Sequence, residues 1–296
     1  MTAVIKVQDL TRRYGKVTAV HEVSFRVSEN SICGLLGRNG AGKTTLMRLV
    51  TGQEFASSGH VRLWGEDPVE NARALSRTCF VRESQVYPDS FRGKHVMRAA
   101  AHLFPNWDAD LAARLVADFN APLSRRMKKM SRGQRSAIGV IIGLASRAEL
   151  TLLDEPYAGL DAVARQLFYD RLLEDYTTFP RTIVLSTHLI DEVSGLLDHV
   201  VVVDNGAVII DAEPDALRGS TVTLVGKHSA VEQFVAGRPT LSWDAIGGIA
   251  SVTLAGLGDK DRADAVAAGL ELAPVSLQQL IVSRTRGSAP REEARS

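Results

Sequence analysis

The first thirty residues carry a pattern of hydrophobic and polar positions that predicts short β-strands. The segments VIKV, VTAV and EVSFRV are separated by turn signals at Tyr14–Gly15 and Glu29–Asn30. Ser31–Leu36 is a further apolar run, and it leads directly into the glycine-rich stretch GRNGAGKTT. The helical spacing of TLMRLV, which stops at Gly52, predicts a helix after this stretch.

Further along the chain, the pattern changes from strands to helices and back. Residues from about 88 to 145 are expected to form a helical insertion, with Asp108 as the N-cap of DADLAARLVADF. The apolar runs LTLLD and TIVLST follow, and such runs are typical of strands buried on both faces of a parallel sheet. A helix is expected between them, and Asn205–Gly206 between VVVVD and VII predicts a hairpin that closes the domain.

The pattern of hydrophobic and polar residues changes after Gly219. Alternating segments such as TVTLVG, SAVEQFVAG and IASVTLAG predict a small unit of strands and helices, and the last residues are polar and charged. We therefore expect a domain over residues 1–219, a small α+β domain over 220–285 and a disordered tail over 286–296. The fold class expected for the first domain is α/β, with an N-terminal antiparallel β subdomain and the helical insertion.

The composition is that of a globular protein with nearly balanced charge. Of 296 residues 45% are hydrophobic, which excludes a disordered protein. Lys+Arg total 35 against 34 Asp+Glu, so no nucleic-acid partner is expected, and the basic run Arg125–Lys129 is interpreted as a solvated face. Cys33 and Cys79 have apolar neighbours and are interpreted as buried side chains in a reducing compartment. We expect neither a signal peptide at the start nor a membrane span, because the longest apolar runs are too short.

The glycine-rich stretch matches the phosphate-loop pattern, and it lies between a predicted strand and a predicted helix as that pattern requires. Its glycines let backbone N–H groups curl around phosphate oxygens, and the helix adds its positive N-terminal end. Lys43 is expected to reach the β- and γ-phosphates, and Thr44 to place its hydroxyl on Mg²⁺. The expected nucleotide-binding residues of this loop are Gly37, Arg38, Asn39, Gly40, Ala41, Gly42, Lys43, Thr44 and Thr45.

A hydrophobic strand that ends in two carboxylates supplies the acid that a phosphate loop needs. In Leu150–Glu155, Asp154 fits the metal side of such a site, while Glu155 points toward the γ-phosphate, where it can accept a proton from the attacking water. Taken alone, an apolar strand that ends in Asp-Glu is as often a strand that meets solvent. Its pairing with the phosphate loop favours the catalytic interpretation.

With these residues the sequence resembles the ATP-binding cassette ATPases, the motor subunits of ABC transporters, over about residues 3–218. Met130–Gln134 resembles the family signature, usually Leu-Ser-Gly-Gly-Gln, which other phosphate-loop families lack. Gly159–Asp161 is similar to the D-loop that follows the catalytic glutamate. Ser186–His188 is similar to the segment that carries the switch histidine, and Tyr14 matches the aromatic residue that stacks on adenine.

The resemblance implies a functional role for each motif, and each motif also has a purely structural interpretation. Ser131, Gly133 and Gln134 would bind the nucleotide held by a partner cassette, although Ser131 also suits an ordinary helix cap. His188 would hold the γ-phosphate and the attacking water, or it is a structural histidine. Asp161 would lie at the dimer seam, or it is an acid that starts a helix, and Tyr14 would bind adenine, or it belongs to the core.

Two residues depart from the family pattern. Glu83 stands where the family carries a glutamine at a strand end; it can still ligate Mg²⁺, but it adds charge and lacks an amide donor. A small shift in register would instead let Gln85 serve. Arg132 replaces the first glycine of the signature, so this helix start is bulkier and more positive. We expect both departures to tune ATP affinity or coupling.

The function implied by the resemblance is ATP hydrolysis by a head-to-tail dimer of cassettes, identical or paralogous, that drives a separate transmembrane permease subunit. The expected location is the cytoplasm, on the inner face of the cell membrane. In the family, a helix of the membrane subunit docks beside the helical segment, near Tyr87 and Phe91 here. The alternative is a soluble cassette ATPase, for example of the iron–sulfur assembly type.

Overall fold

The computed structural model describes residues 2–83, 85–219 and 221–287, and it divides into two compact units. The first comprises the chain up to His188 together with Leu196–Asp211, and the second comprises Leu189–Gly195 and the chain from Ala212 onward. The second unit begins before the boundary expected at residue 219. The reason is that α8 (Pro214–Gly219) packs on the strand that follows it, and α7 (Ile190–Val193) packs on the last helix.

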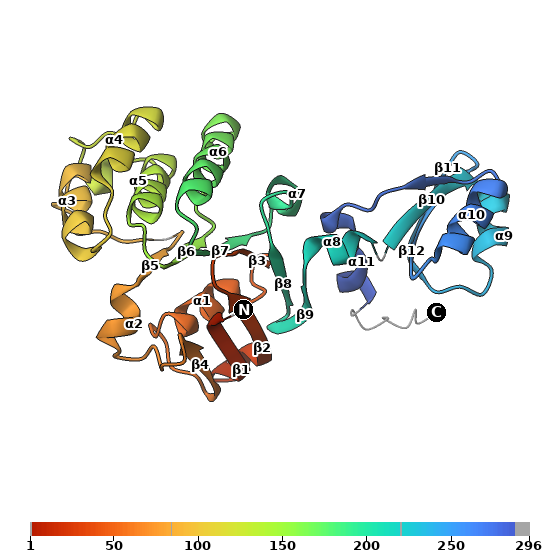
Figure 1. Cartoon of the computed structure of the whole chain (residues 1–296), viewed down its shortest axis with the longest axis horizontal. Coiled ribbons are helices and arrows are strands. Elements are labelled where there is room, and N and C mark those ends of the chain that lie inside the picture. The colour runs from red at the N-terminus through yellow and green to blue at the C-terminus, as the bar shows by residue number, and fades with distance from the viewer. Residues whose placement is uncertain (1, 84, 220, 288–296) are drawn as a thin grey trace. The chain divides into compact units, whose positions relative to one another are not determined.

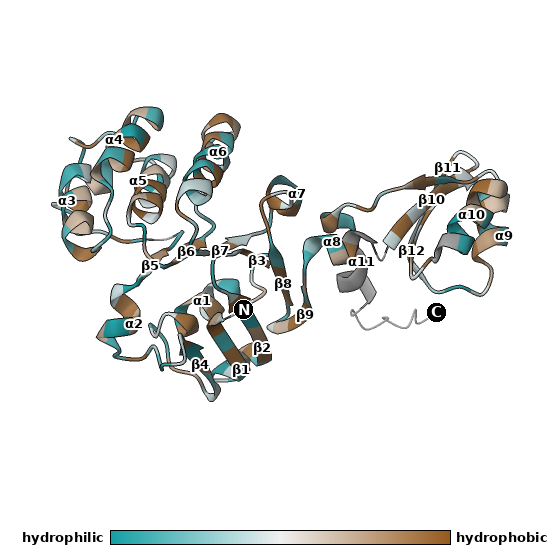
Figure 2. Cartoon of the chain, in the orientation of Figure 1, coloured by the Kyte–Doolittle hydropathy of each residue, from teal (hydrophilic) through white to brown (hydrophobic). Residues whose placement is uncertain are grey.

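The centre of the first unit is a six-stranded sheet in the order β5-β6-β7-β3-β8-β9 (Figure 1). The pairs from β5 to β8 are all parallel. β3, β6 and β7 are buried along their whole length, and Figure 2 shows hydrophobic residues along β8. This burial confirms the sequence expectation of strands covered on both faces. The strands are β3 (Ile32–Leu36), β5 (Thr78–Val81), β6 (Leu150–Asp154), β7 (Thr182–Thr187), β8 (His199–Asp204) and β9 (Ala207–Ala212).

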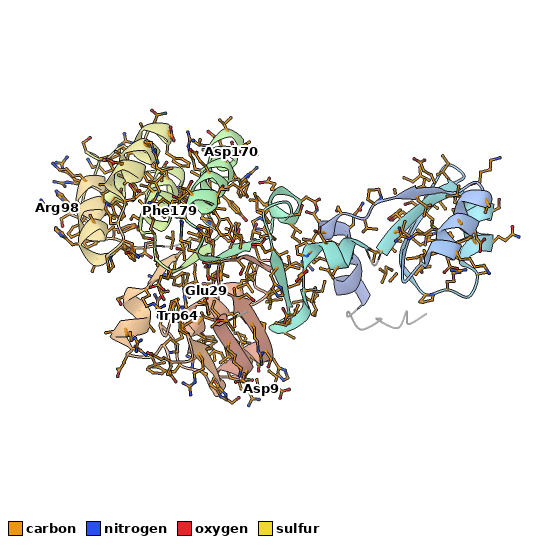
Figure 3. The ribbon with its side chains drawn as sticks, viewed as in Figure 1. Asp9, Glu29, Trp64, Arg98, Asp170 and Phe179 are labelled. Atoms are coloured by element: carbon orange, nitrogen blue, oxygen red, sulfur yellow. The ribbon has the colours of Figure 1, made fainter. Side chains whose placement is uncertain are left out.

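An antiparallel sheet in the order β2-β1-β4 forms the N-terminal subdomain that the sequence predicts. Its strands are β1 (Ala3–Tyr14), β2 (Val17–Ser28) and β4 (Ser58–Leu63). Helix α1 (Lys43–Val50) shares one hydrophobic core with both sheets, because Leu46 and Met47 pack with Leu10 of β1 and Leu152 of β6. Trp64, which follows β4, has its ring 3.9 Å from the guanidinium of Arg77 (Figure 3).

The helical insertion is also present, and Figure 1 shows α3, α4, α5 and α6 grouped beside β5, β6 and β7. The Asp108 carboxylate accepts a hydrogen bond from the Leu111 N–H at 2.7 Å, which confirms Asp108 as the N-cap of α4. Arg98 of α3 is exposed and points away from the core (Figure 3). The helices are α2 (Ala72–Ser76), α3 (Gly93–Leu103), α4 (Ala109–Asp118), the 3₁₀ turn η1 (Met127–Lys129), α5 (Arg132–Ala145) and α6 (Ala162–Thr178).

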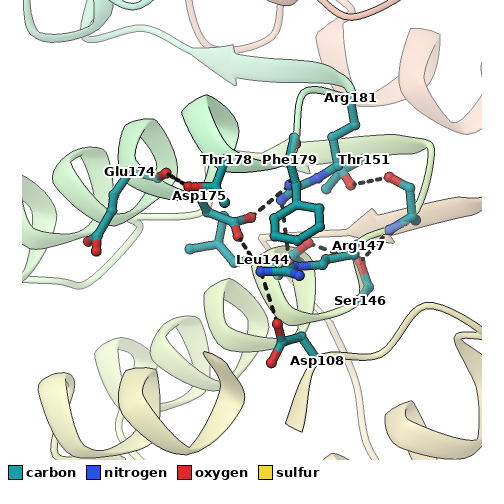
Figure 4. A network of polar contacts seen from close by, with 12 residues as sticks. Asp108, Leu144, Ser146, Arg147, Thr151, Glu174, Asp175, Thr178, Phe179 and Arg181 are labelled. Atoms are coloured by element: carbon teal, nitrogen blue, oxygen red, sulfur yellow. Dashed lines mark hydrogen bonds and ion pairs between the residues drawn. The ribbon is translucent and has the colours of Figure 1, made fainter. Parts of the chain in front are cut away.

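A buried network of charges ties these helices to the sheet (Figure 4). The carboxylate of Asp175, on α6, accepts hydrogen bonds from Arg181 at 2.7 Å and from Arg147 at 3.2 Å. Arg147, which follows α5, also pairs with Asp108 at 2.9 Å, and its guanidinium lies 3.4 Å from the centre of the Phe179 ring. Three helices and the approach to β7 are thereby joined through the carboxylates of Asp108 and Asp175.

The second unit contains a four-stranded antiparallel sheet in the order β11-β12-β10-β13. Together with α9 and α10, these strands follow the βαββαβ order of a ferredoxin-like arrangement, which meets the α+β expectation. Val231 of α9 and Ala265 of α10 pack on Leu224 and Val252 of the sheet. The elements are β10 (Thr221–Lys227), α9 (His228–Val235), β11 (Thr240–Ile246), β12 (Ile249–Ala255), α10 (Asp259–Ala267), β13 (Glu271–Ala273) and α11 (Leu277–Gly287).

Two expectations concern the end of the chain and the membrane. α11 extends to Gly287 and so takes in the first two residues of the expected tail, while residues 288–296 lie outside the described part of the chain. Among the described residues, none of the helices combines the length and the hydrophobicity that a membrane crossing requires.

Candidate functional site

The phosphate loop runs from the end of β3 to the start of α1, as the sequence predicts. Gly42 is the N-cap of α1 and has a φ of 107°, a conformation that favours glycine. A Cβ atom at Gly42 would also lie 2.5 Å from the carbonyl oxygen of Ala19, on β2. The turn between β8 and β9 also contacts the loop, because the Gly206 N–H donates to the carbonyl of Ala41 at 3.0 Å. The backbone of the loop is therefore fixed by neighbouring strands.

Lys43 is buried at the centre of this loop. Its ammonium group donates to the carbonyl oxygens of Gly37 at 2.7 Å and Arg38 at 3.1 Å, and it lies 3.6 Å from a carboxylate oxygen of Glu155. A cation with several rotatable N–H donors is thus held between the loop and the Glu155 carboxylate. This is the position from which the lysine of a phosphate loop reaches the β- and γ-phosphates.

Asp154 and Thr44 come together from two different elements. The Thr44 hydroxyl, on α1, donates to one oxygen of Asp154 at 2.7 Å, and Ser186, on β7, donates to the other at 2.8 Å. Burial raises the pKa of Asp154, and the two hydroxyl donors oppose that shift. Hydroxyl and carboxylate oxygens are hard ligands, and Mg²⁺ in nucleotide sites is held by one or two such protein oxygens together with phosphates. The donor set fits Mg²⁺.

Glu155 lies among polar side chains of three elements. Its backbone has a φ of 46°, in the left-handed region, and its N–H donates to the Ser186 carbonyl at 3.2 Å. The Nδ1 atom of His188 lies 2.9 and 3.0 Å from the two carboxylate oxygens. The structure thus brings together the glutamate and the histidine that the sequence singles out. It adds Tyr157, whose hydroxyl donates to Glu155 at 2.8 Å.

The signature segment forms the N-terminus of α5. The Ser131 hydroxyl accepts a hydrogen bond from the Gln134 N–H at 3.2 Å, and the Gln134 side chain accepts one from the Ser131 N–H at 3.2 Å. This is a capping box, so the cap reading of Ser131 is confirmed, while its contact with a nucleotide stays a prediction. A Cβ atom at Gly133 would lie 2.2 Å from the carbonyl oxygen of Gly159, which explains the glycine by packing within the chain.

The two departures from the family pattern contact each other. The Arg132 guanidinium, at the start of α5, forms an ion pair with the Glu83 carboxylate, beyond the end of β5. Gln85 is nearby and accepts a hydrogen bond from Arg82 at 3.3 Å. These side chains line a cavity of about 520 Å³ that also borders Glu155. Glu83 is thus engaged by an arginine, and its role as a metal ligand stays a prediction.

Tyr14 and Asp161 have separate surroundings. Tyr14 is 41% exposed, which excludes the core reading; its hydroxyl donates to Glu54, and the Arg12 guanidinium lies 4.5 Å from the ring centre. Asp161 accepts a hydrogen bond from the Ala164 N–H at 2.8 Å and caps α6, as an acid at a helix start does. Their contacts with adenine and with a second cassette stay predictions.

The comparisons with known proteins agree with this geometry. The "ABC transporter" family model matches residues 20–158. The "Nod factor export ATP-binding protein I" of Ralstonia nicotianae is 33% identical over 226 residues, which cover 73% of this chain and 69% of that protein. The protein of the same name from Cupriavidus metallidurans is 30% identical over 228 residues, or 75% of each chain.

Solved structures support the same fold. A structure described as the ATP binding subunit of an ABC transporter superposes with a TM-score of 0.65 at 23% identity, and the match covers 73% of this chain and 92% of that chain. A second, the ATP-binding cassette MJ1267, gives a TM-score of 0.60 at 18% identity and covers 73% of this chain and 93% of that chain. The chain belongs to the ABC transporter family and is an ATP-binding and ATP-hydrolysing subunit of such a transporter.

Proposed function

We propose that this chain acts in a head-to-tail dimer of cassettes, with Mg²⁺ and ATP bound between the phosphate loop of one chain and the signature helix of the other. The observation that carries this proposal is the convergence of three side chains. The Glu155 carboxylate lies 3.6 Å from the ammonium nitrogen of Lys43 and 2.9 Å from Nδ1 of His188. The second cassette is an identical copy or a paralogue. Ser131 and Gly133 of α5 serve the nucleotide of that partner.

Binding of ATP relies on donors that the phosphate loop and the start of α1 bring close together. Lys43 donates to the β- and γ-phosphates, and the N–H groups of the loop and of the first turn of α1 bind the remaining oxygens. Thr44 and Asp154 hold Mg²⁺, which neutralises charge on the phosphates when it is bound. The exposed ring of Tyr14 offers its free surface to the adenine.

Hydrolysis then requires an acceptor for the proton of water. Glu155 accepts this proton while the water oxygen bonds to the γ-phosphorus and the bond to the bridging oxygen of ADP breaks. His188 holds the γ-phosphate and the attacking water. Lys43 and His188, which contact Glu155 in this structure, turn toward the phosphate when ATP binds.

The test of this mechanism is Glu155→Gln, which keeps the shape of the side chain but removes the proton acceptor. We expect ATP to bind while turnover falls at least about 100-fold, the scale of lost general-base catalysis. The variant should elute as an ATP-dependent dimer in size-exclusion chromatography. Turnover at the native rate would remove Glu155 from the mechanism, and a monomer that holds ATP would remove the shared site.

We also propose that the permease subunit docks at an apolar groove beside the helical segment, which places the chain in the cytoplasm at the inner face of the membrane. A cavity of about 270 Å³ lies there, and apolar side chains line most of it. Leu103 at its rim is 72% exposed, and burial raises the pKa of Tyr87 to about 12. Such a groove suits an apolar helix of a membrane protein. The lining includes Val81, Tyr87, Phe91, Val96, Leu103 and Phe104.

Docking can be separated from ATP binding. Phe91→Asp should weaken association with the membrane fraction while the dissociation constant of ATP stays within about twofold, and Arg98→Asp on the exposed face of α3 is the matched control. The chain is tagged in its native cell, crosslinked and fractionated. If the unchanged chain stays in the cytosol and captures only soluble proteins, the soluble cassette ATPase replaces this proposal.

A further inference from the structure

Tyr157 makes a contact with the catalytic glutamate that neither the sequence motifs nor the family pattern assigns. It lies in the loop between β6 and α6, and its side chain is buried, with 4% of its surface exposed. Its hydroxyl donates to Glu155 Oε2 at 2.8 Å and also hydrogen-bonds with the hydroxyl of Thr187. Thr187 ends β7 and directly precedes His188. One hydroxyl thus joins the glutamate to the strand end that carries the histidine.

Glu155 needs such support because its backbone has a φ of 46°. A residue other than glycine in this region is strained and persists only where its surroundings hold it. The carboxylate is held by Lys43, His188 and Tyr157. In the proposed mechanism the first two turn to the γ-phosphate when ATP binds, so the hydroxyl of Tyr157 is the contact that can remain.

The ring of Tyr157 is itself held in place. It packs edge-on against Tyr169 of α6, with ring centres 6.3 Å apart, and its centre lies 6.4 Å from that of the His188 ring. Burial raises the pKa of Tyr157, and the charge of Glu155 adds to that shift. The phenol is therefore protonated near neutral pH, where it can donate to the carboxylate.

We propose that Tyr157 is a positioning residue for ATP hydrolysis, whose hydroxyl keeps the Glu155 carboxylate aimed at the attacking water once Lys43 and His188 have turned to the phosphate. This inference rests on the proposed role of Glu155 as the proton acceptor. Tyr157 transfers no proton itself. Its effect is to fix the acceptor oxygen, because a carboxylate that rotates away from the water loses the geometry that general-base catalysis needs.

The test is Tyr157→Phe, which removes the hydroxyl and keeps the ring. We expect kcat to fall about tenfold, the scale of a lost hydrogen bond to a charged group, while KM and the dissociation constant of labelled ATP stay within about twofold. The matched control is Tyr176→Phe, which deletes a hydroxyl that donates to the Asn30 carbonyl at 2.7 Å, away from the site. This control should leave kcat unchanged. Thermal melting of all variants shows whether each is folded.

A second measurement separates positioning from general damage. In a Glu155→Gln background, Tyr157→Phe should lower the residual rate by less than about twofold, because the group that it positions is gone. A tenfold loss in both backgrounds, a raised KM, or an unchanged kcat in the single variant would each overturn the inference. If Glu155→Gln itself keeps the native rate, the proposed function fails instead, so the two failures are distinct.

Discussion

Arg132, at the first position of α5, is ion-paired with Glu83, which follows β5, the strand that pairs with β6. Each residue alone is a departure from the family pattern, and together they form one contact between the signature segment and the end of β5. The two side chains are 61% and 38% exposed, and ion pairs of that exposure contribute about 1 kcal/mol or less to stability. The pair therefore contributes little to the folding of the chain.

The first prediction concerns this pair. Arg132→Gly and Glu83→Gln should each lower ATPase activity about threefold, because each leaves one charge without its partner beside the cavity that borders Glu155. The double variant, which carries both residues usual in the family, should recover most of the loss. Steady-state hydrolysis at low and high salt is the measurement. Additive losses in the double variant would show that the two residues act independently.

The second prediction concerns nucleotide binding. Lys43→Ala removes the ammonium that lies between the loop carbonyls and Glu155, so the affinity for ATP and the turnover should both collapse. An equilibrium titration with labelled ATP measures the affinity. The exposed Lys94→Ala is the control and should bind ATP normally. Near-normal affinity in the Lys43 variant would contradict the phosphate-loop assignment.

The third prediction concerns pH and Asp154. Because burial raises its pKa in the folded state, this carboxyl favours folding when protonated, and that contribution is present at low pH and lost as the pH rises through the folded-state pKa. Asp154→Asn should therefore raise the melting temperature of the nucleotide-free protein near pH 7, with a gain that shrinks toward pH 4. The same variant should lose the stabilisation that Mg²⁺-ATP gives the unchanged chain. Melting scans across pH, with and without nucleotide, test both effects.

The fourth prediction concerns the buried network of Figure 4. Asp175→Asn should lower the free energy of unfolding by about 3–5 kcal/mol, because the buried Arg181 would keep its charge without the carboxylate that compensates it, and Arg147 would keep only its pair with Asp108. Glu174→Gln on the same helix breaks the exposed pair with Arg171 and should cost less than about 1 kcal/mol. Denaturant unfolding measures both. Equal losses of stability in the two variants would mean that burial does not determine how much the contacts of Asp175 contribute.

The sequence predicts those parts of the site that depend on local order. The phosphate loop, the strand that ends in Asp154 and Glu155, and the N-cap at Asp108 each rest on residues a few positions apart. Apolar runs likewise predict the buried parallel strands, since burial on both faces leaves few polar positions. In these places local pattern and tertiary structure make the same demand on the chain.

Contacts between residues distant in sequence could not be predicted in this way. The pairing of Glu83 with Arg132 and that of Asp175 with Arg147 each depend on how separate elements pack. The role of Tyr157 could not be predicted for another reason. A tyrosine two residues after Glu155 is equally consistent with a core residue, and only the position of its hydroxyl shows the hydrogen bond to Glu155. The start of the second unit also differs from the expected boundary, because α8 packs on the strand that follows it.

The close approach of Gly133 and Gly159 bears on how such chains diverge. Any side chain at Gly133 would collide with the Gly159 carbonyl within the same subunit, before a nucleotide or a second cassette is involved. Selection for folding alone would therefore retain this glycine in a duplicated copy that no longer hydrolyses ATP. The residues whose loss would mark such a decayed copy are instead Glu155 and Lys43, whose side chains meet in the proposed site and can be shortened without a collision with the backbone.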